Sequence, residues 1–454
     1  MDDRVKVQAL AETVKRGLSG RRLDDAAIIV SAVDSEMRRF TDNSITISKG
    51  WHHFNVTLYL VKEGKAFGFE SSNIAEDGIK RMLKEALNLA PHTPAPDVEP
   101  ELEHGPHLIG RFTSAFDPGI LNLRDRSVDL IEEALNAASG EGAMRSSGTL
   151  IYGRRERVIK TLTGCEGSES STFLEFSIRS FCGEESTGNG VWCGSSLRGF
   201  DPAEVGREAG VKAYEAQDPV EGAPGVYNVV FEPPAMAALL ETVASSSSAY
   251  MAEIGLSYLK GKVGKRIAAR CLDLSDDPRN PTSPMVSYFD DEGRETHPVR
   301  IVQSGILKSL LHTSKTAKRF AVNPTGSAYF SPSVGDMVPS ATAITVEKGK
   351  SSKEELLEMV DEGLLIRNLW YTRFQNYLTG DFSSVPRDGI LRIKDGRVYG
   401  AVKGLRIGDN MLRILSSIKG LGDERAWIKW WEVDTPILAP PCLVEDVRLT
   451  KSTK

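Results

Sequence analysis

The chain has 454 residues, which predicts two or three domains because single hydrophobic cores rarely grow beyond roughly 250–300 residues. Hydrophobic residues make up 40 %, charged residues 26 %, and the net charge is −6. This balance excludes global disorder and nucleic-acid binding through bulk charge. No apolar run is long enough to span a membrane, and the first residues carry no signal-peptide pattern. We therefore expect a soluble, cytoplasmic α+β protein that binds neither nucleic acid nor membrane.

The first 90 residues are predicted to form an N-terminal α/β domain. Apolar residues follow helical spacing over 5–18 and 74–89. A β-branched run over 25–33 and alternating patterns over 38–48 and 53–61 predict strands. Prolines at 91, 94, 96, 100 and 106 then interrupt a polar stretch, because proline continues neither helices nor central strands. We interpret 91–117 as a linker.

A middle α/β domain is predicted over 118–218. It begins with a helix at 125–138, continues through strands at 149–152, 158–163 and 172–181, and ends with a helix at 202–216. The remaining residues, 225–454, predict a large strand-rich C-terminal domain. There a strand at 226–231 precedes a helix opened by Pro233 and Pro234, and Asp395-Gly396 predicts a hairpin turn.

The sequence lacks the familiar catalytic motifs. The sequence contains neither HExxH nor HExxxH, and no glycine-rich dinucleotide loop follows a predicted strand. The five cysteines form no CxxC pair and are interpreted as buried free thiols. Residues alone therefore predict no catalytic group, no metal ligand and no cofactor.

Two weak patterns keep another interpretation open, that of an enzyme with an unrecognised site. Ser257 and Lys260 match a serine–lysine nucleophile pattern whose partner motifs are missing. A run of acidic residues suggests a cation site, although we expect an exposed acidic loop instead. These acidic residues are Asp273, Asp276, Asp277, Asp290, Asp291 and Glu292.

One segment resembles a known family. Residues 231–248, FEPPAMAALLETVASSSS, resemble the start of the C-terminal domain of the TldD/PmbA family, which reads strand, proline, helix. In the catalytic TldD branch this helix carries the HExxxH zinc motif. Alignment on the proline and the paired leucines puts the two histidines and the glutamate of that motif at Glu241, Ser246 and Thr242. All three are replaced, as in the non-catalytic PmbA (TldE) branch.

Other segments resemble the family in the expected order, namely residues 37–44, 143–148, 289–293, 302–308, 325–326, 380–384 and 440–447. The chain departs from the catalytic branch near its C-terminus. That branch supplies a third zinc ligand from a Cys-Gly-Lys motif, whereas residues 424–428 here read ERAWI, with no cysteine. Cys442 stands at a small residue of the closing block instead.

The resemblance implies a non-catalytic subunit in a cytoplasmic heterodimer with a TldD-like zinc peptidase that cleaves unfolded peptides. A homodimer would be the alternative when the partner is missing. The family's old name, modulator of DNA gyrase, keeps open a non-enzymatic regulator or scaffold that binds other proteins.

The helix that begins at Pro233 has two predicted faces. One should face the core and carries Met236, Leu239, Leu240, Val243, Ser247, Tyr250 and Ile254. The other carries Glu241, Ser245, Ser248 and Ala252. We interpret Ser245 and Ser248 as lining the inner chamber, with a plain core helix as the alternative.

Overall fold

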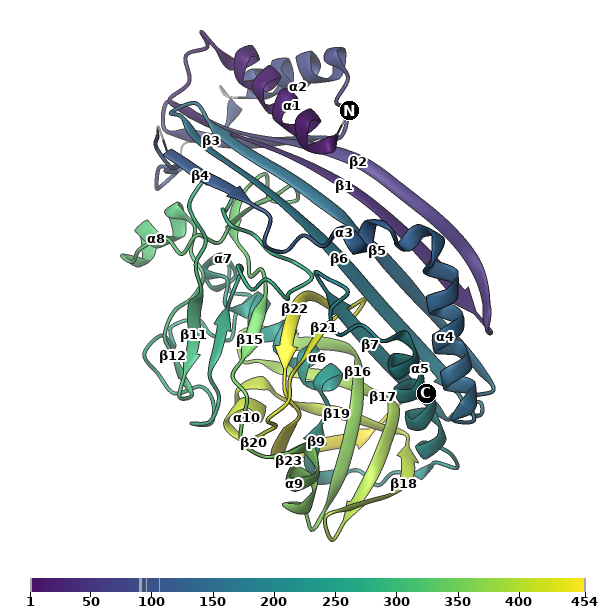
Figure 1. Cartoon of the computed structure of the whole chain (residues 1–454). Coiled ribbons are helices and arrows are strands. Elements are labelled where there is room, and N and C mark those ends of the chain that lie inside the picture. The colour runs from purple at the N-terminus through teal and green to yellow at the C-terminus, as the bar shows by residue number, and fades with distance from the viewer. Residues whose placement is uncertain (1, 90–91, 95, 106, 453–454) are drawn as a thin grey trace.

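The computed structural model of the chain describes residues 2–89, 92–94, 96–105 and 107–452. Its mixed helices and strands, with a strand-rich C-terminal region, match the predicted α+β class (Figure 1). No helix in the described part of the chain is long and apolar enough to cross a bilayer.

A seven-stranded sheet runs through both N-terminal ranges, in the order β3-β2-β1-β5-β6-β4 with β7 paired to β6. β1 pairs antiparallel with β5 along most of its length, which joins segments more than a hundred residues apart. The ranges predicted as two domains therefore share one sheet, and β4 lies within the predicted linker. The strands are β1 Asp25–Thr41, β2 Ser44–Lys62, β3 Lys65–Ser71, β4 His107–Phe112, β5 Arg145–Thr161, β6 Cys165–Phe181 and β7 Thr187–Gly194.

The tip of the long β1–β2 hairpin corrects one prediction. A single strand was expected over 38–48, but the chain reverses at Asp42 and Asn43. Both residues adopt positive φ angles, 49° and 63°, which Asp and Asn tolerate better than most residues. The alternating pattern therefore belongs to two strands on either side of a tight turn.

The α-helices described before the C-terminal region are α1 Asp3–Leu18, α2 Glu76–Leu89, α3 Pro118–Leu121, α4 Ser127–Gly140 and α5 Pro202–Glu215. α1 and α2 cover alternate residues of β1 such as Ile28 and Val30, while α4 and α5 cover the far part of the sheet, around Leu150 and Phe176. α5 was predicted from its sequence, and Asp201 caps it by accepting hydrogen bonds from Ala203 and Glu204.

The C-terminal region contains an eight-stranded sheet, a six-stranded sheet and the hairpin β13–β14. Helix α6 packs against β16 and β22 inside the largest core cluster (Figure 1). The predicted Asp395-Gly396 turn joins β17 to β18, with Lys394 paired to Arg397. The helices are α6 Pro233–Ser246, α7 Ala249–Glu253, α8 Ser314–Phe320, α9 Lys353–Glu358 and α10 Met411–Ser416.

The strands of this region fall into three groups along the chain. The first is β8 Val220–Glu221, β9 Gly225–Phe231, β10 Leu274–Asp276, β11 Val299–Gln303 and β12 Ile306–Leu307. The next is β13 Ala328–Ser331, β14 Asp336–Pro339, β15 Ile344–Val346, β16 Glu362–Asn376, β17 Asp381–Lys394 and β18 Arg397–Lys403. The last is β19 Leu405–Asn410, β20 Ile418–Leu421, β21 Ala426–Trp430, β22 Val433–Ala439 and β23 Cys442–Lys451.

The helix-free face of the N-terminal sheet packs against the C-terminal region. Ala27 and Tyr59 of the sheet join Tyr288, Phe289 and Phe330 in one apolar cluster. Beside it, the buried guanidinium of Arg157 on β5 bonds Glu169 at 2.9 Å and also contacts Asp291. Apolar packing and a buried ion cluster therefore hold the two regions together.

The acidic run is not the exposed loop that its sequence predicted. Asp276, Asp290, Asp291 and Glu292 are buried, with at most 6 % of each residue exposed. Burial raises the pKa of both Asp290 and Glu292. The charge of Asp291 raises the pKa of Asp290 further, and the charge of Asp290 raises that of Glu292. Backbone amides, Arg157 and Arg294 satisfy these carboxylates. Arg294 is close in sequence, but Arg157 and Ala328 lie too far along the chain for the acidic pattern to reveal.

Candidate functional site

Helix α6 carries the three positions that the resemblance equates with the zinc motif. It follows β9 directly, opens with Pro233 and Pro234, and is buried along most of its length. The helix ends at Ser246, and Ser248 takes an extended conformation before α7 begins. The predicted core face is therefore wrong at its end, where Tyr250 is only partly buried and Ile254 is 48 % exposed.

A buried ion cluster fixes the start of α6. Glu232, the N-cap, is 2 % exposed and lies 2.8 Å from Nζ of Lys212 and 2.7 Å from Nζ of Lys353. Nε of Arg367 lies 3.9 Å from the oxygen that Lys353 contacts. Lys212 belongs to α5, so this cluster joins the helix layer of the N-terminal sheet to the first turn of α6.

Glu241 occupies the position of the motif's first histidine and is bound to Thr435 of β22. The backbone N–H and the hydroxyl of Thr435 each donate a hydrogen bond of 3.1 Å to the carboxylate. Burial raises the pKa of Glu241 to about 7, against the opposing effect of these two bonds. At neutral pH this carboxyl is held partly protonated in a site shaped by its own chain.

Thr242 and Ser246, at the other two positions, are also engaged. The Thr242 hydroxyl donates to the Leu239 carbonyl at 2.7 Å and lies 3.3 Å from the hydroxyl of Tyr258. The Ser246 carbonyl accepts a 2.6 Å hydrogen bond from Ser257. Tyr258 is 1 % exposed, so its ring and hydroxyl fill the space beside this face of the helix.

The two serines predicted to line a chamber differ in exposure. Ser245 is exposed and donates to the Thr242 carbonyl at 3.1 Å. Ser248 is buried, and its hydroxyl donates to the Pro339 carbonyl at 2.8 Å. The hydroxyl of Ser248 is therefore engaged inside the fold, and a chamber-lining role stays a prediction for Ser245.

These residues do not fit a catalytic zinc ion. Such a site uses three nitrogen, sulfur or carboxylate ligands, whereas this helix offers one carboxylate and two hydroxyls. The Glu241 carboxylate and the Thr242 hydroxyl are already bonded within the chain. Across the described residues, no group of three His, Cys, Asp or Glu side chains is arranged to hold a metal. Cys442 begins β23 as a fully buried thiol, and burial raises its pKa.

The serine–lysine pattern gives no nucleophile either. Ser257 is fully buried, donates to the Ser246 carbonyl and accepts from the N–H of Leu259. Lys260 is exposed, and its backbone N–H donates to the Ser257 carbonyl at 3.3 Å. Through these two hydrogen bonds the Ser257 hydroxyl instead stabilises the loop that follows α7.

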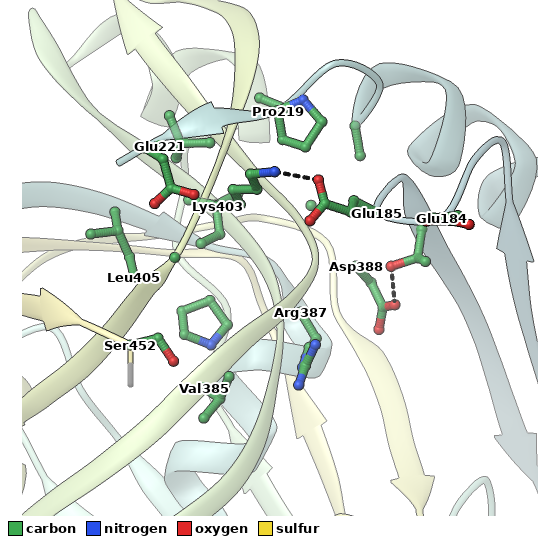
Figure 2. A pocket seen from close by; sticks show the side chains of 18 of the residues that line it. Glu184, Glu185, Pro219, Glu221, Val385, Arg387, Asp388, Lys403, Leu405 and Ser452 are labelled. Atoms are coloured by element: carbon green, nitrogen blue, oxygen red, sulfur yellow. Dashed lines mark hydrogen bonds and ion pairs between the residues drawn. The ribbon is translucent and has the colours of Figure 1, made fainter. Parts of the chain in front are cut away.

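Two cavities lie where the N-terminal sheet meets the C-terminal region. The larger, about 870 Å³, is lined by residues of β7, β17 and β18 (Figure 2). Lys403 and Glu185 point toward one another across it and form an ion pair, and Asp388 and Arg387 lie on its wall. Its charged groups are of both signs, and Arg179 and Asp388 form a second ion pair there.

The smaller cavity, about 500 Å³, lies between the sheet and three tryptophans, Trp370, Trp430 and Trp431. It shares Arg179 and Asp388 with the larger one. Sequence reasoning missed this cavity, because its floor and its roof come from strands nearly two hundred residues apart. The adjacent tryptophans at 430 and 431 were the available signal.

Known proteins resemble this chain in sequence and in fold. Residues 224–451, half of the chain, match the PmbA/TldA metallopeptidase C-terminal domain, and residues 124–216 match the central domain. A metalloprotease of Methanothermobacter thermautotrophicus is 26 % identical over 318 residues, 65 % of this chain and 66 % of that relative, so the match spans just under two thirds of its length.

Solved structures with the same fold cover nearly the whole chain. A proposed modulator of a DNA gyrase from Thermotoga maritima has a TM-score of 0.83 at 21 % identity, over 98 % of this chain and all of its own. TldE from Thermococcus kodakarensis has a TM-score of 0.80 at 19 % identity, over 98 % and 99 %. With half of its length matched by the family's C-terminal domain, the chain belongs to the TldD/PmbA metallopeptidase family.

Proposed function

We propose that this chain is the non-catalytic, TldE-like subunit of a cytoplasmic heterodimer whose other subunit carries HExxxH and the zinc ion. The observation that carries the proposal is the state of Glu241, Thr242 and Ser246. Their side chains are one carboxylate and two hydroxyls, and Thr435 and Tyr258 already occupy that face of the helix. In this role the chain forms part of the wall of the peptide-binding chamber and helps to position unfolded peptides, and the partner carries out the hydrolysis.

A hydrolase with its own unrecognised site finds little support, because Ser257 is buried and the acidic run is bonded inside the fold. A scaffold or regulator acting without a peptidase partner remains a second candidate, and its discriminating property is the identity of the bound protein.

Co-purification tests the proposal. The chain, expressed together with an HExxxH-bearing relative from the same genome, should co-elute with it in equal amounts. Elemental analysis should find zinc at one ion per heterodimer and none in this chain alone, since its helix lacks the ligand set. Stoichiometric zinc in the isolated chain, lost on Glu241→Ala, would contradict the proposal. Failure to associate with any such relative would favour the scaffold.

A further inference from the structure

The cavity of about 500 Å³ has a polar floor made by the N-terminal sheet. On β7, Gly188, Gly190 and Trp192 face the helix layer, since a Cβ on either glycine would meet the backbone of α5. Strand alternation therefore turns Asn189 to the opposite face, toward the C-terminal region. Neighbouring strands continue this face with Arg179 and with Thr149 and Ser177, whose hydroxyls lie 3.1 Å apart.

Tryptophans of the C-terminal region form the roof. Figure 1 shows β7 next to β21 and β17, and these elements are in contact. The ring centroid of Trp370 lies 6.2 Å from that of Trp430 and 4.9 Å from that of Trp431. The guanidinium of Arg179 stacks on Trp370 at 4.6 Å, which links floor and roof.

Four buried polar atoms at this cavity have neither a hydrogen-bond partner nor an ion-pair partner among the described residues. They are Nδ2 and Oδ1 of Asn189 and Nε1 of Trp370 and Trp430. Nε of Arg179 also makes no hydrogen bond there, but it is paired with Asp388. Asn189 is 3 % exposed, so bulk water does not satisfy its amide. Buried polar groups are almost always paired, so this cluster of unpaired atoms marks a place where ordered water or a bound ligand completes their hydrogen bonds.

Two charged groups of the cavity, Arg179 and Asp388, are in contrast paired with each other. Asp388 accepts from Thr187 at 3.0 Å and from Asn368 at 2.9 Å, and it lies 2.7 Å from Nε of Arg179. The occupant must therefore satisfy one amide, which needs a donor and an acceptor, and two indole N–H donors, which need acceptors. A peptide main chain offers N–H and C=O groups in this combination.

We infer that this cavity binds the main chain of an extended peptide, with Asn189 pairing one peptide unit and the indoles of Trp370 and Trp430 donating to carbonyl oxygens. The tryptophan rings would cover the apolar parts of the bound segment without selecting one side chain. This reading deepens the proposed function, on which its biological role rests, by giving the non-catalytic subunit its own grip on unfolded substrate.

The test uses the full chain and two blocked peptides, N-acetyl-Ala-Val-Ala-Val-Ala amide and the same peptide with N-methyl groups on its central amides. Calorimetry and tryptophan fluorescence should detect saturable binding of the first. N-methylation removes main-chain donors and keeps the side chains, so it should weaken binding ~10-fold or more. Asn189→Leu and Trp430→Phe should each weaken it by a similar factor, and Trp51→Phe, outside the cavity, should not.

Equal affinity for both peptides would overturn main-chain recognition, as would unchanged binding by Asn189→Leu. A stronger response to N-acetylalanine than to the blocked peptide would indicate a carboxylate site instead. Failure of the inference and failure of the proposed function are distinguishable. A heterodimer that cleaves peptide with unchanged KM after Asn189→Leu would sink only the inference, and peptide binding by a chain that joins no peptidase would sink only the proposed function.

Discussion

The α6 face around Glu241 and the tryptophan cavity around Asn189 are both partly polar and buried, yet they differ in how their polar groups are used. Around α6, Glu241, Thr242 and Ser257 have partners from the same chain. At the cavity, Asn189 and two indoles have none among the described residues. A closed hydrogen-bond network stabilises a fold, whereas an open one marks a place for a ligand.

The first test of this comparison removes a side chain that packs beside α6. Tyr258→Ala removes a fully buried ring that packs beside Thr242 and near Phe374, at a centroid distance of 5.6 Å. We expect the free energy of unfolding to fall by about 3–5 kcal/mol, as for other large-to-alanine core changes. Urea denaturation measures it, with Tyr258→Phe as the matched control. A loss below about 1 kcal/mol would show that this face is not packed as described.

The second test introduces the HExxxH residues into α6. The triple change Glu241→His, Thr242→Glu and Ser246→His puts larger side chains where Thr242 is 7 % and Ser246 is 3 % exposed. Overpacking should cost about 1–3 kcal/mol per buried site. The variant should also hydrolyse no peptide, because residues 424–428 supply no third ligand and nothing orients the new histidines. Chelator-sensitive hydrolysis restored by zinc would contradict this reading.

A pH series sharpens the comparison at Glu241. Burial raises its folded pKa to about 7, above the unfolded value, so the native state binds the extra proton between about pH 4.5 and 7. This carboxyl therefore lowers stability as pH rises through that window. Glu241→Gln stays neutral and still accepts from the Thr435 N–H, so its advantage should grow from near zero at pH 4.5 to about 1–3 kcal/mol at pH 8. A gap that does not change with pH would disprove the shift.

The smallest effect is expected at the cavity. Asn189→Leu replaces an unpaired amide with an apolar side chain of similar size, so the peptide-free chain should gain about 1 kcal/mol. Thermal unfolding without peptide measures this gain. Thr187→Val removes the hydroxyl that donates to Asp388, so this variant should destabilise the chain instead. If Asn189→Leu also destabilises the chain, then Asn189 is part of the fold's own network.

Local patterns in the sequence predicted the elements that depend on neighbours along the chain. α5, the proline-opened start of α6 and the Asp395-Gly396 hairpin all rest on caps and turns that the sequence displays. Long-range pairing was not predictable in this way. Three examples join residues that are far apart in the chain, so no local pattern could predict the partner. They are β1 with β5, Arg157 with Asp291, and Asn189 with Trp370 across the cavity.

The candidate site divides along the same line. The resemblance supplied positions 241, 242 and 246, but the partners that occupy them, Thr435 and Tyr258, follow only from the fold. The polar residues around Ser248 predict an exposed side chain. The helix ends at Ser246, however, and the Ser248 hydroxyl donates to the Pro339 carbonyl. Helical spacing could not foresee the end of the helix within four consecutive serines.

The most direct test of the central claim is peptide hydrolysis by the reconstituted heterodimer with one variant in each subunit. Replacing the HExxxH glutamate of the partner by glutamine should abolish cleavage of an unfolded peptide, since the partner is proposed to supply the chemistry. Glu241→Ala in this chain should leave kcat within about twofold, because Glu241 touches only Thr435 of its own fold in the hydrogen bonds described. Loss of activity from Glu241→Ala in an intact, zinc-loaded heterodimer, or activity of this chain alone, would contradict the account.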